Sequence, residues 1–139
     1  MKGNQYMLKR NKRFLIMILA SVFPFVFAGC SAGSSASYEQ ISGTEAKALM
    51  DCESGYIIID ARTQEEYDEG HIPGAILIPE YEIADRAENE VPDKKQLILV
   101  YCRSGRRSKI AAEELVKLGY TNVKEFGGII DWKYEIVKN

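Results

Sequence analysis

The sequence predicts an α/β fold in which a parallel sheet of about five strands carries helices on both faces. Short apolar runs rich in β-branched residues alternate with segments whose apolar residues recur at helical spacing. The runs are continuous rather than alternating, which is typical of strands buried on both faces and therefore of parallel sheets. Parallel neighbours need crossover connections, and the helical segments supply them.

Two capping boxes mark the first two helices of the folded part, which we expect to begin near Tyr38. In Ser42–Glu45 and Thr63–Glu66, a hydroxyl and a carboxylate three residues apart satisfy the free N–H groups of a first helical turn. The second helix ends at Gly70. The first helix has an apolar stripe of Ala46, Leu49 and Met50, after which Cys52 is expected to be ordinary helix filling.

Four segments are the candidate strands. Three of them are the runs Tyr56–Ile59, Ala75–Ile78 and Leu97–Tyr101, and the fourth is the short segment Val123–Phe126. The charged segment over residues 80–95 predicts a helix, because Ile83, Ala87 and Val91 follow at four-residue spacing.

Two further helices are predicted after the third strand. The first has Ala111, Leu115 and Leu118 on one face and ends at Gly119. The second follows Gly127 and Gly128, and its apolar face is expected to be Ile129, Trp132 and Ile136.

The chain of 139 residues is long enough for one domain, and its charge is unevenly distributed. Residues 1–30 hold five basic and no acidic residues, whereas residues 31–139 hold 13 basic and 20 acidic residues, a net charge of −7. An acidic body argues against nucleic acid as a partner, because that binding rests on neutralising phosphates with basic surface. Chemistry on an anion must then come from a local basic site.

The first 29 residues are predicted to be a signal peptide. A basic segment precedes the apolar run Phe14–Phe27, which is too short to cross a bilayer as a helix and is interrupted by Pro24. The motif Phe27-Ala-Gly-Cys30 resembles the lipobox of bacterial lipoproteins, which implies cleavage before Cys30 and acylation of that cysteine. The alternatives are an uncleaved anchor helix or an ordinary signal peptide with a chance cysteine.

A lipid at Cys30 would hold the protein on the outer face of the cell membrane, or on an outer membrane if one is present. The serine- and glycine-rich residues 30–37 then form a flexible linker. The folded domain is predicted over residues 38–139, and it is expected to be monomeric.

The segment Cys102–Ser108 carries the most specific chemical signal. Cys102 directly follows a buried strand, Gly105 lets the backbone curl, and a helix begins shortly afterwards. Such a loop aims several N–H groups at one point, and together with the helix start it stabilises an anion, so Cys102 is predicted to be a thiolate nucleophile. The basic and hydroxyl groups expected to serve the same anion site are Arg103, Arg106, Arg107, Ser104 and Ser108. The alternative is an inert buried cysteine beside exposed arginines.

This loop resembles that of the rhodanese family of sulfurtransferases. The resemblance extends over the whole body and includes three further motifs in the family's order and spacing. These are Ile59-Asp-Ala-Arg62, Gly70-His-Ile-Pro-Gly-Ala75 and Phe126-Gly-Gly128. The family implies a parallel sheet of about five strands wrapped by helices, and a persulfide carried on Cys102 within a ring of backbone amides.

The resemblance implies a two-step sulfur transfer without a separate cofactor. Cys102 takes the outer sulfur of a small anionic donor such as thiosulfate, and a thiol, cyanide or a protein cysteine then accepts it. Arg103 or Arg106 could dock the donor, while Arg107 is expected to brace the loop. One alternative is a sulfur-relay or binding module with little activity of its own. Another is a phosphatase or arsenate reductase, although those enzymes have a loop one residue longer before their arginine.

Three polar residues near this edge are expected to be structural. The family uses the pair Asp60 and Arg62 as a brace, as expected for a buried carboxylate that needs a partner. His71, the single histidine, is expected to fix a turn rather than to act as a base for Cys102.

No metal site is predicted, since the chain has one histidine and no paired-cysteine spacing. The enzyme assignment requires amide N–H groups turned toward the Cys102 sulfur, and a thiol sealed in apolar surroundings away from solvent would contradict it.

Overall fold

The computed structural model of this protein describes residues 37–138. The predicted signal peptide over residues 1–29, the predicted lipidation site Cys30 and the linker up to residue 36 therefore lie outside the described residues. Within the described range, no helix is long and apolar enough to cross a membrane.

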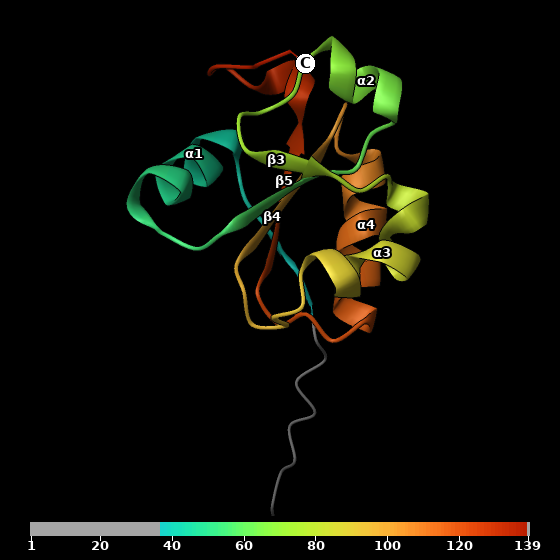
Figure 1. Cartoon of the computed structure of the whole chain (residues 1–139). Coiled ribbons are helices and arrows are strands. Elements are labelled where there is room, and N and C mark those ends of the chain that lie inside the picture. Colours follow the sequence, from blue (N-terminus) through green and yellow to red (C-terminus); the bar gives the residue numbers. More distant parts are fainter. Residues whose placement is uncertain (1–36, 139) are drawn as a thin grey trace, which may run out of the picture. The chain divides into compact units, whose positions relative to one another are not determined.

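The described chain forms one five-stranded sheet, and all its neighbouring strands are parallel. The strands are β1 (Glu39–Gln40), β2 (Ile57–Asp60), β3 (Ala75–Leu77), β4 (Ile98–Cys102) and β5 (Val123–Gly128). Their order across the sheet is β1-β5-β4-β2-β3, so that β4 is central (Figure 1). The predicted α/β class with a parallel sheet of about five strands is confirmed. The two-residue strand β1 at the edge has no apolar run, which is why the sequence pattern missed it.

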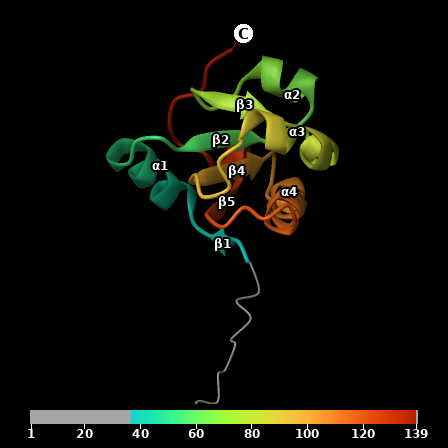
Figure 2. The same ribbon diagram turned by 60° about the horizontal axis from the view of Figure 1, so that its bottom comes forward.

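Helices cover both faces of the sheet, as predicted. They are α1 (Gly43–Cys52), α2 (Gln64–Glu69), α3 (Ile83–Glu90) and α4 (Arg106–Lys117), with 3₁₀ turns η1 (Glu80–Glu82) and η2 (Ile129–Asp131). Figure 2 shows the sheet with α1 on one side and with α3 and α4 on the other. Both capping boxes are present, with Ser42 and Thr63 as the N-caps of α1 and α2.

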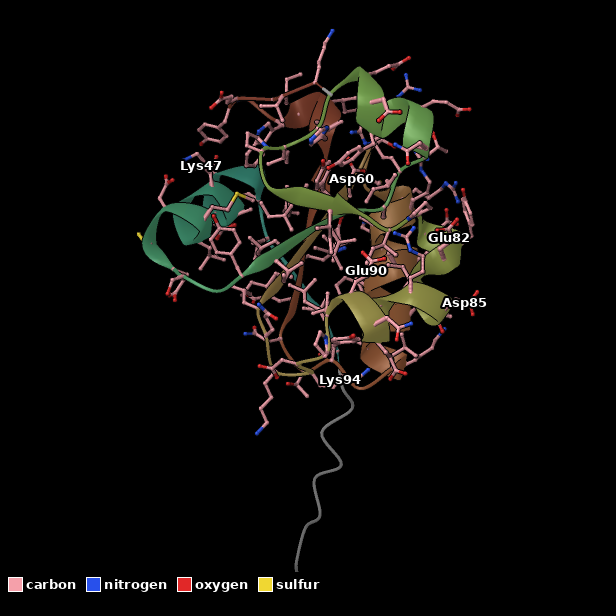
Figure 3. The ribbon with its side chains drawn as sticks, viewed as in Figure 1. Lys47, Asp60, Glu82, Asp85, Glu90 and Lys94 are labelled. Carbon is pink, nitrogen blue, oxygen red and sulfur yellow. The ribbon has the colours of Figure 1, made fainter. Side chains whose placement is uncertain are left out.

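The core consists of two apolar layers, one on each face of the sheet. Because side chains alternate along a strand, Ile59 and Val100 face α3 and α4, whereas Ile58 and Leu99 face α1. Polar residues at the carboxyl ends of β2 and β4 therefore reach the same edge of the sheet, where ligands bind in open parallel sheets. Figure 3 shows Asp60, the last residue of β2, within the body of the domain, while Glu82 and Asp85 lie at its margin.

The last predicted helix is wrong. After Gly128 the chain makes only the 3₁₀ turn η2, and it then runs past Trp132 to an antiparallel bridge between Val137 and His71. Trp132 is partly buried and packs against the core, with its ring centroid 5.6 Å from that of Phe126, but it does not lie on a helix. Ile136, expected on the apolar helix face, is 50% exposed. The helical spacing of apolar residues was misleading because contacts with distant parts of the chain hold this segment extended.

Cys52 also differs from its expected role as helix filling. It is the last residue of α1 and is exposed.

Candidate active site

Cys102 ends the central strand β4, and the loop that follows it turns its backbone toward the sulfur. The amide N–H of Gly105 donates a hydrogen bond to Cys102 Sγ at 3.1 Å. Gly105 itself lies in the left-handed region with φ of 97°, a conformation that glycine adopts without a Cβ penalty. The predicted arrangement of strand, tight loop and helix start is confirmed.

The environment of Cys102 favours its thiolate despite deep burial. The residue is 1% exposed and packs partly against the apolar core on the α4 side of the sheet. Burial by itself raises the pKa of the thiol. The hydroxyl and amide of Ser108 and the amides of Ser104 and Gly105 more than offset it, so that the pKa of Cys102 is lowered overall. The thiol is thus buried, but it is not sealed in apolar surroundings.

A bulge in β5 brings the strand close to this loop. Val100 pairs with Glu125, but Cys102, two residues on, pairs with Gly128, so that β5 has one extra residue. Gly127 at the bulge has a φ of 87°. A Cβ on Gly128 would lie 2.2 Å from the carbonyl oxygen of Arg103, so only glycine lets β5 and the loop pack this closely.

The three arginines of the loop have different surroundings. Arg107 forms two hydrogen bonds with the Glu66 carboxylate of α2, at 2.7 and 2.8 Å. This pairing holds the pKa of Glu66 at about 2. Arg103 and Arg106 are exposed, and among residues 37–138 neither forms an ion pair. Arg107 is thus tied to α2, whereas Arg103 and Arg106 are exposed cations of the loop.

Asp60 and Arg62 form a buried pair beside the loop. Arg62 donates to the Asp60 carboxylate through Nε and a terminal nitrogen, the latter at 2.7 Å, and the same nitrogen donates to the carbonyl of Gly70. The Tyr101 hydroxyl donates to Asp60 at 2.5 Å and accepts from the Ile72 amide. Burial and the Asp60 charge raise the pKa of Tyr101, so its hydroxyl stays protonated and continues to donate.

His71 contacts the turn rather than the cysteine. Its Nδ1 lies 2.9 Å from the carbonyl oxygen of Tyr67, and its ring stacks on the Tyr67 ring with centroids 3.7 Å apart. Its backbone exchanges two hydrogen bonds with Val137. The contacts of this side chain are therefore those of a residue that fixes the turn.

Sequence reasoning missed two acids that the fold brings to the loop. Glu66 was interpreted only as part of a capping box, and its pairing with Arg107 bridges 41 positions of sequence. Glu125 is 3% exposed, and it accepts from the Ser108 hydroxyl at 2.6 Å and from the Gly127 amide at 2.8 Å. An acid within the short predicted strand Val123–Phe126 was the signal that could have drawn attention to Glu125.

Within residues 37–138, no group of three or more His, Cys, Asp or Glu side chains could hold a metal ion.

Comparisons with known proteins agree with this geometry. Thiosulfate sulfurtransferase PspE of Escherichia coli (strain K12) is 45% identical over 73 residues, which cover 52% of this chain and 70% of PspE. The putative sulfur carrier protein YrkF of Bacillus subtilis (strain 168) is 36% identical over 103 residues, which cover 73% of this chain and 55% of YrkF. The chain therefore matches only about half the length of YrkF.

A solved structure of a rhodanese with anions from E. coli is similar over 60% of this chain and 99% of that chain, with 42% identity and a TM-score of 0.58. The model of the rhodanese-like domain family matches residues 42–135, which include the loop and its supporting pairs. The chain therefore belongs to the rhodanese-like domain family, whose members include thiosulfate sulfurtransferases.

Proposed function

We propose that this protein is a sulfurtransferase that carries a sulfane sulfur as a persulfide on Cys102. The donor is a small anion such as thiosulfate, and the acceptor is cyanide, a small thiol or a protein cysteine. The observation that carries the proposal is the set of donors around the Cys102 sulfur, with the Gly105 amide at 3.1 Å. Such donors stabilise negative charge on a sulfur atom and therefore favour both a thiolate and a persulfide anion.

The two steps balance without an added oxidant or reductant. In the first step, the Cys102 thiolate attacks the outer sulfur of thiosulfate, a new S–S bond forms, the old S–S bond breaks, and sulfite leaves. In the second step, cyanide attacks the outer sulfur of the Cys102 persulfide and leaves as thiocyanate, which restores the thiolate. Negative charge stays on sulfur at the loop throughout, where the amides compensate it.

The exposed cations Arg103 and Arg106 are proposed to dock the anionic donor, because neither is engaged in an ion pair within residues 37–138. Arg107 is proposed to brace the loop, since its guanidinium is already occupied by Glu66. Asp60, Arg62 and His71 are proposed to support the edge of the sheet from behind.

The loop length favours sulfur over phosphorus. Five residues separate the cysteine from the arginine in protein tyrosine phosphatases, whereas four separate Cys102 from Arg107 here. The shorter loop suits a bound sulfur atom better than a tetrahedral phosphoryl group.

A second candidate function is a sulfur relay with little activity on thiosulfate alone. The similarity to the putative sulfur carrier protein YrkF favours it, because the same persulfide could be loaded by a partner protein. Turnover of thiosulfate and cyanide by the purified protein separates the two functions, since a pure relay would show little.

The test is intact-mass spectrometry of the protein after thiosulfate treatment, together with an assay of thiocyanate formation. We expect a gain of one sulfur that is lost on adding cyanide. Cys102→Ser should abolish both the mass gain and turnover, whereas Cys52→Ser, at an exposed position on α1, should retain them. Thiocyanate formation by a folded Cys102→Ser variant would refute the proposal.

A further inference from the structure

An open pocket of about 410 Å³ lies at the carboxyl edge of the sheet, beside the loop that follows Cys102. Its walls come from the start of α1, from η2 and from the segment after η2. Ile130 of η2 lines the pocket, and its amide N–H donates to the carbonyl oxygen of Arg103 at 3.3 Å. The pocket is therefore built against the residue next to Cys102. The sulfur-transfer steps described above assign no role to it.

Trp132 forms an aromatic wall of this pocket and is held in one orientation. Its ring packs against the rings of Phe126 and Tyr134, with centroids 5.6 and 4.9 Å away. Its indole N–H donates to the carbonyl oxygen of Glu135 at 3.1 Å. Tyr134 lines the same pocket. Because these rings are already fixed, a side chain that packs on them orders little of the protein on binding, which favours affinity.

The rest of the lining is mixed in character. Ile130 is 63% exposed, and Thr44, Asp131 and Lys133 add a hydroxyl and charges of both signs. Such a mixture suits a peptide segment, because an apolar side chain packs on Ile130 and Trp132 while the peptide amides meet the polar groups. A small anion such as thiosulfate would meet a carboxylate and apolar rings here. The pocket therefore fits a peptide better than it fits the sulfur donor.

Two cations of the neighbouring loop add a charge preference. Arg103 and Arg106 are exposed and form no ion pair in the part of the chain that the structure describes. The body over residues 31–139 nevertheless has a net charge of −7. Cations that the protein's own acids leave unpaired are complementary to acidic groups on a partner. Sulfite leaves before an acceptor arrives, so the same two cations can serve the donor and the acceptor in turn.

The burial of Cys102 favours an acceptor that is held in place. Cys102 is 1% exposed, so a thiol that accepts its sulfur has to approach along a narrow path. Docking orients such a thiol and raises its effective concentration at the reacting atom. An extended peptide advances about 3.3 Å per residue, so a few residues separate a side chain in the pocket from a thiol at the loop.

We propose that the pocket lined by Ile130 and Trp132, together with Arg103 and Arg106, docks a protein acceptor of the sulfur. The acceptor cysteine has acidic neighbours that pair with the two arginines, and a large apolar residue a few positions away enters the pocket. The acceptor thiolate attacks the outer sulfur of the Cys102 persulfide, a new S–S bond forms, and the bond to Cys102 breaks with its electron pair left on the Cys102 thiolate. The inference deepens the proposed sulfurtransferase function, on which its transfer step rests.

A second copy of this chain fits the same face less well. A two-fold dimer formed through it would bring the arginines of both loops together, because each copy contributes the same patch to such an interface. Like charges across an interface oppose association. The same dimer would also cover the approach to Cys102.

A membrane surface fits less well because of where the described chain begins. Ser37 and Tyr38 lie beside Val116 and Lys117, in the last turn of α4, whereas the loop joins the first turn of this helix. A helix of 12 residues is about 18 Å long. A lipid anchor at Cys30 would therefore attach to the domain at the end opposite the pocket, which leaves this face toward soluble partners.

The first experiment measures binding through tryptophan fluorescence, because Trp132 is the single tryptophan of the chain and lines the pocket. The full chain is titrated with a short peptide that has a serine in place of the acceptor cysteine, glutamates beside it and a phenylalanine a few residues away. We expect a saturable change that is weakened about tenfold in Ile130→Ser and retained in Ile136→Ser, whose isoleucine is 50% exposed outside this pocket. A peptide with lysines in place of the glutamates should also bind about tenfold more weakly.

Two results of this titration would overturn the inference. One is the absence of any change with the glutamate peptide, and the other is equal affinity of the two peptides or of wild type and Ile130→Ser. The titration uses no sulfur donor, so its failure is distinguishable from failure of the sulfurtransferase function.

The second experiment follows the transfer itself from thiosulfate-loaded protein to the matching cysteine peptide, as the gain of one sulfur by mass spectrometry. Ile130→Ser should lower kcat/KM for the peptide about tenfold and leave thiocyanate formation from cyanide unchanged, because cyanide does not use the pocket. Equal losses with both acceptors would show that Ile130 acts on the loop and not on docking. Self-association, or binding to vesicles of anionic lipid, that Ile130→Ser abolishes would assign the face to another occupant and overturn the proposal.

Discussion

At the scale of single residues, Gly128 shows how a backbone position controls the site. Its φ of −121° is open to any residue, so the requirement for glycine comes from packing alone. The Cβ of any other residue would lie 2.2 Å from the Arg103 carbonyl oxygen and 2.5 Å from the Ser104 Cα. Both atoms belong to backbone, so the clash cannot be relieved by rotating a side chain.

Gly128→Ala is therefore expected to push residues 103 and 104 away from β5 and to disturb the Gly105 amide on the Cys102 sulfur. The alkylation rate of Cys102 at neutral pH and thiosulfate turnover should both fall at least about tenfold, and stability should fall by about 1–3 kcal/mol, as is usual for overpacking. Gly43→Ala is the matched control, since its Cβ would meet only the Trp132 side chain at 3.5 Å. Equal rates in the two variants would show that the close approach does not position the loop.

At the scale of elements, α2 contributes to the site through one side chain. This helix has six residues and no buried residue, yet its Glu66 reaches Arg107 at the start of α4. Glu66 also accepts from the amide of the N-cap Thr63, so the residue that completes the capping box of α2 also ties this helix to α4. The loop after Cys102 joins β4 to α4, and the Glu66–Arg107 ion pair holds the end of this loop where α4 begins.

Glu66→Gln tests this connection through the pH dependence of stability. Arg107 lowers the pKa of Glu66 from 4.5 to about 2 in the folded protein, so the unfolded chain binds this proton at higher pH. The stabilisation is complete above pH 4.5 and is lost as the pH falls toward 2. We expect the wild type to exceed Glu66→Gln by about 1 kcal/mol at neutral pH in urea unfolding, with the difference vanishing near pH 2.

The exposed neighbour Glu65 provides the control for this measurement, because it has the same charge on the same helix turn without an arginine partner. Glu65→Gln should leave stability nearly unchanged across this range of pH. A Glu66→Gln difference that stayed constant down to pH 2 would show that the ion pair is not its origin.

At the scale of the whole molecule, the charge distribution distinguishes the basic residues 1–30 from the acidic body over residues 31–139. The basic and apolar start of the chain and the motif ending at Cys30 lead us to propose that the mature protein begins at Cys30 and is held on the outside of a membrane by its lipid. The acidic body, with its short basic loop, would then face small anions and thiols outside the cell.

Labelling of growing cells with a tagged fatty acid tests this proposal. The wild type and Cys52→Ser should incorporate the label, and Cys30→Ser should not, because only position 30 follows the small pair before the predicted cut. Intact mass of the wild type should correspond to a chain starting at residue 30 plus acyl groups. An unlabelled wild type with its first 29 residues retained would favour an uncleaved anchor instead.

The sequence by itself determined the features that rest on neighbouring residues. Both capping boxes, the buried strands β2 and β4, and the order of strand, loop and helix around Cys102 follow from local hydrogen bonding and hydrophobic spacing, which act within a few positions. These features were enough to indicate the family.

Only the tertiary structure decided what lies around that loop. The pairs Glu66–Arg107 and Ser108–Glu125 join residues 41 and 17 positions apart, and no spacing rule connects them. The same holds for the segment after Gly128, where helical spacing was overridden by packing on Phe126 and by backbone pairing with His71. Local pattern thus identifies Cys102 as the proposed nucleophile, whereas the polar and charged groups around its loop depend on which distant side chains the sheet brings beside it.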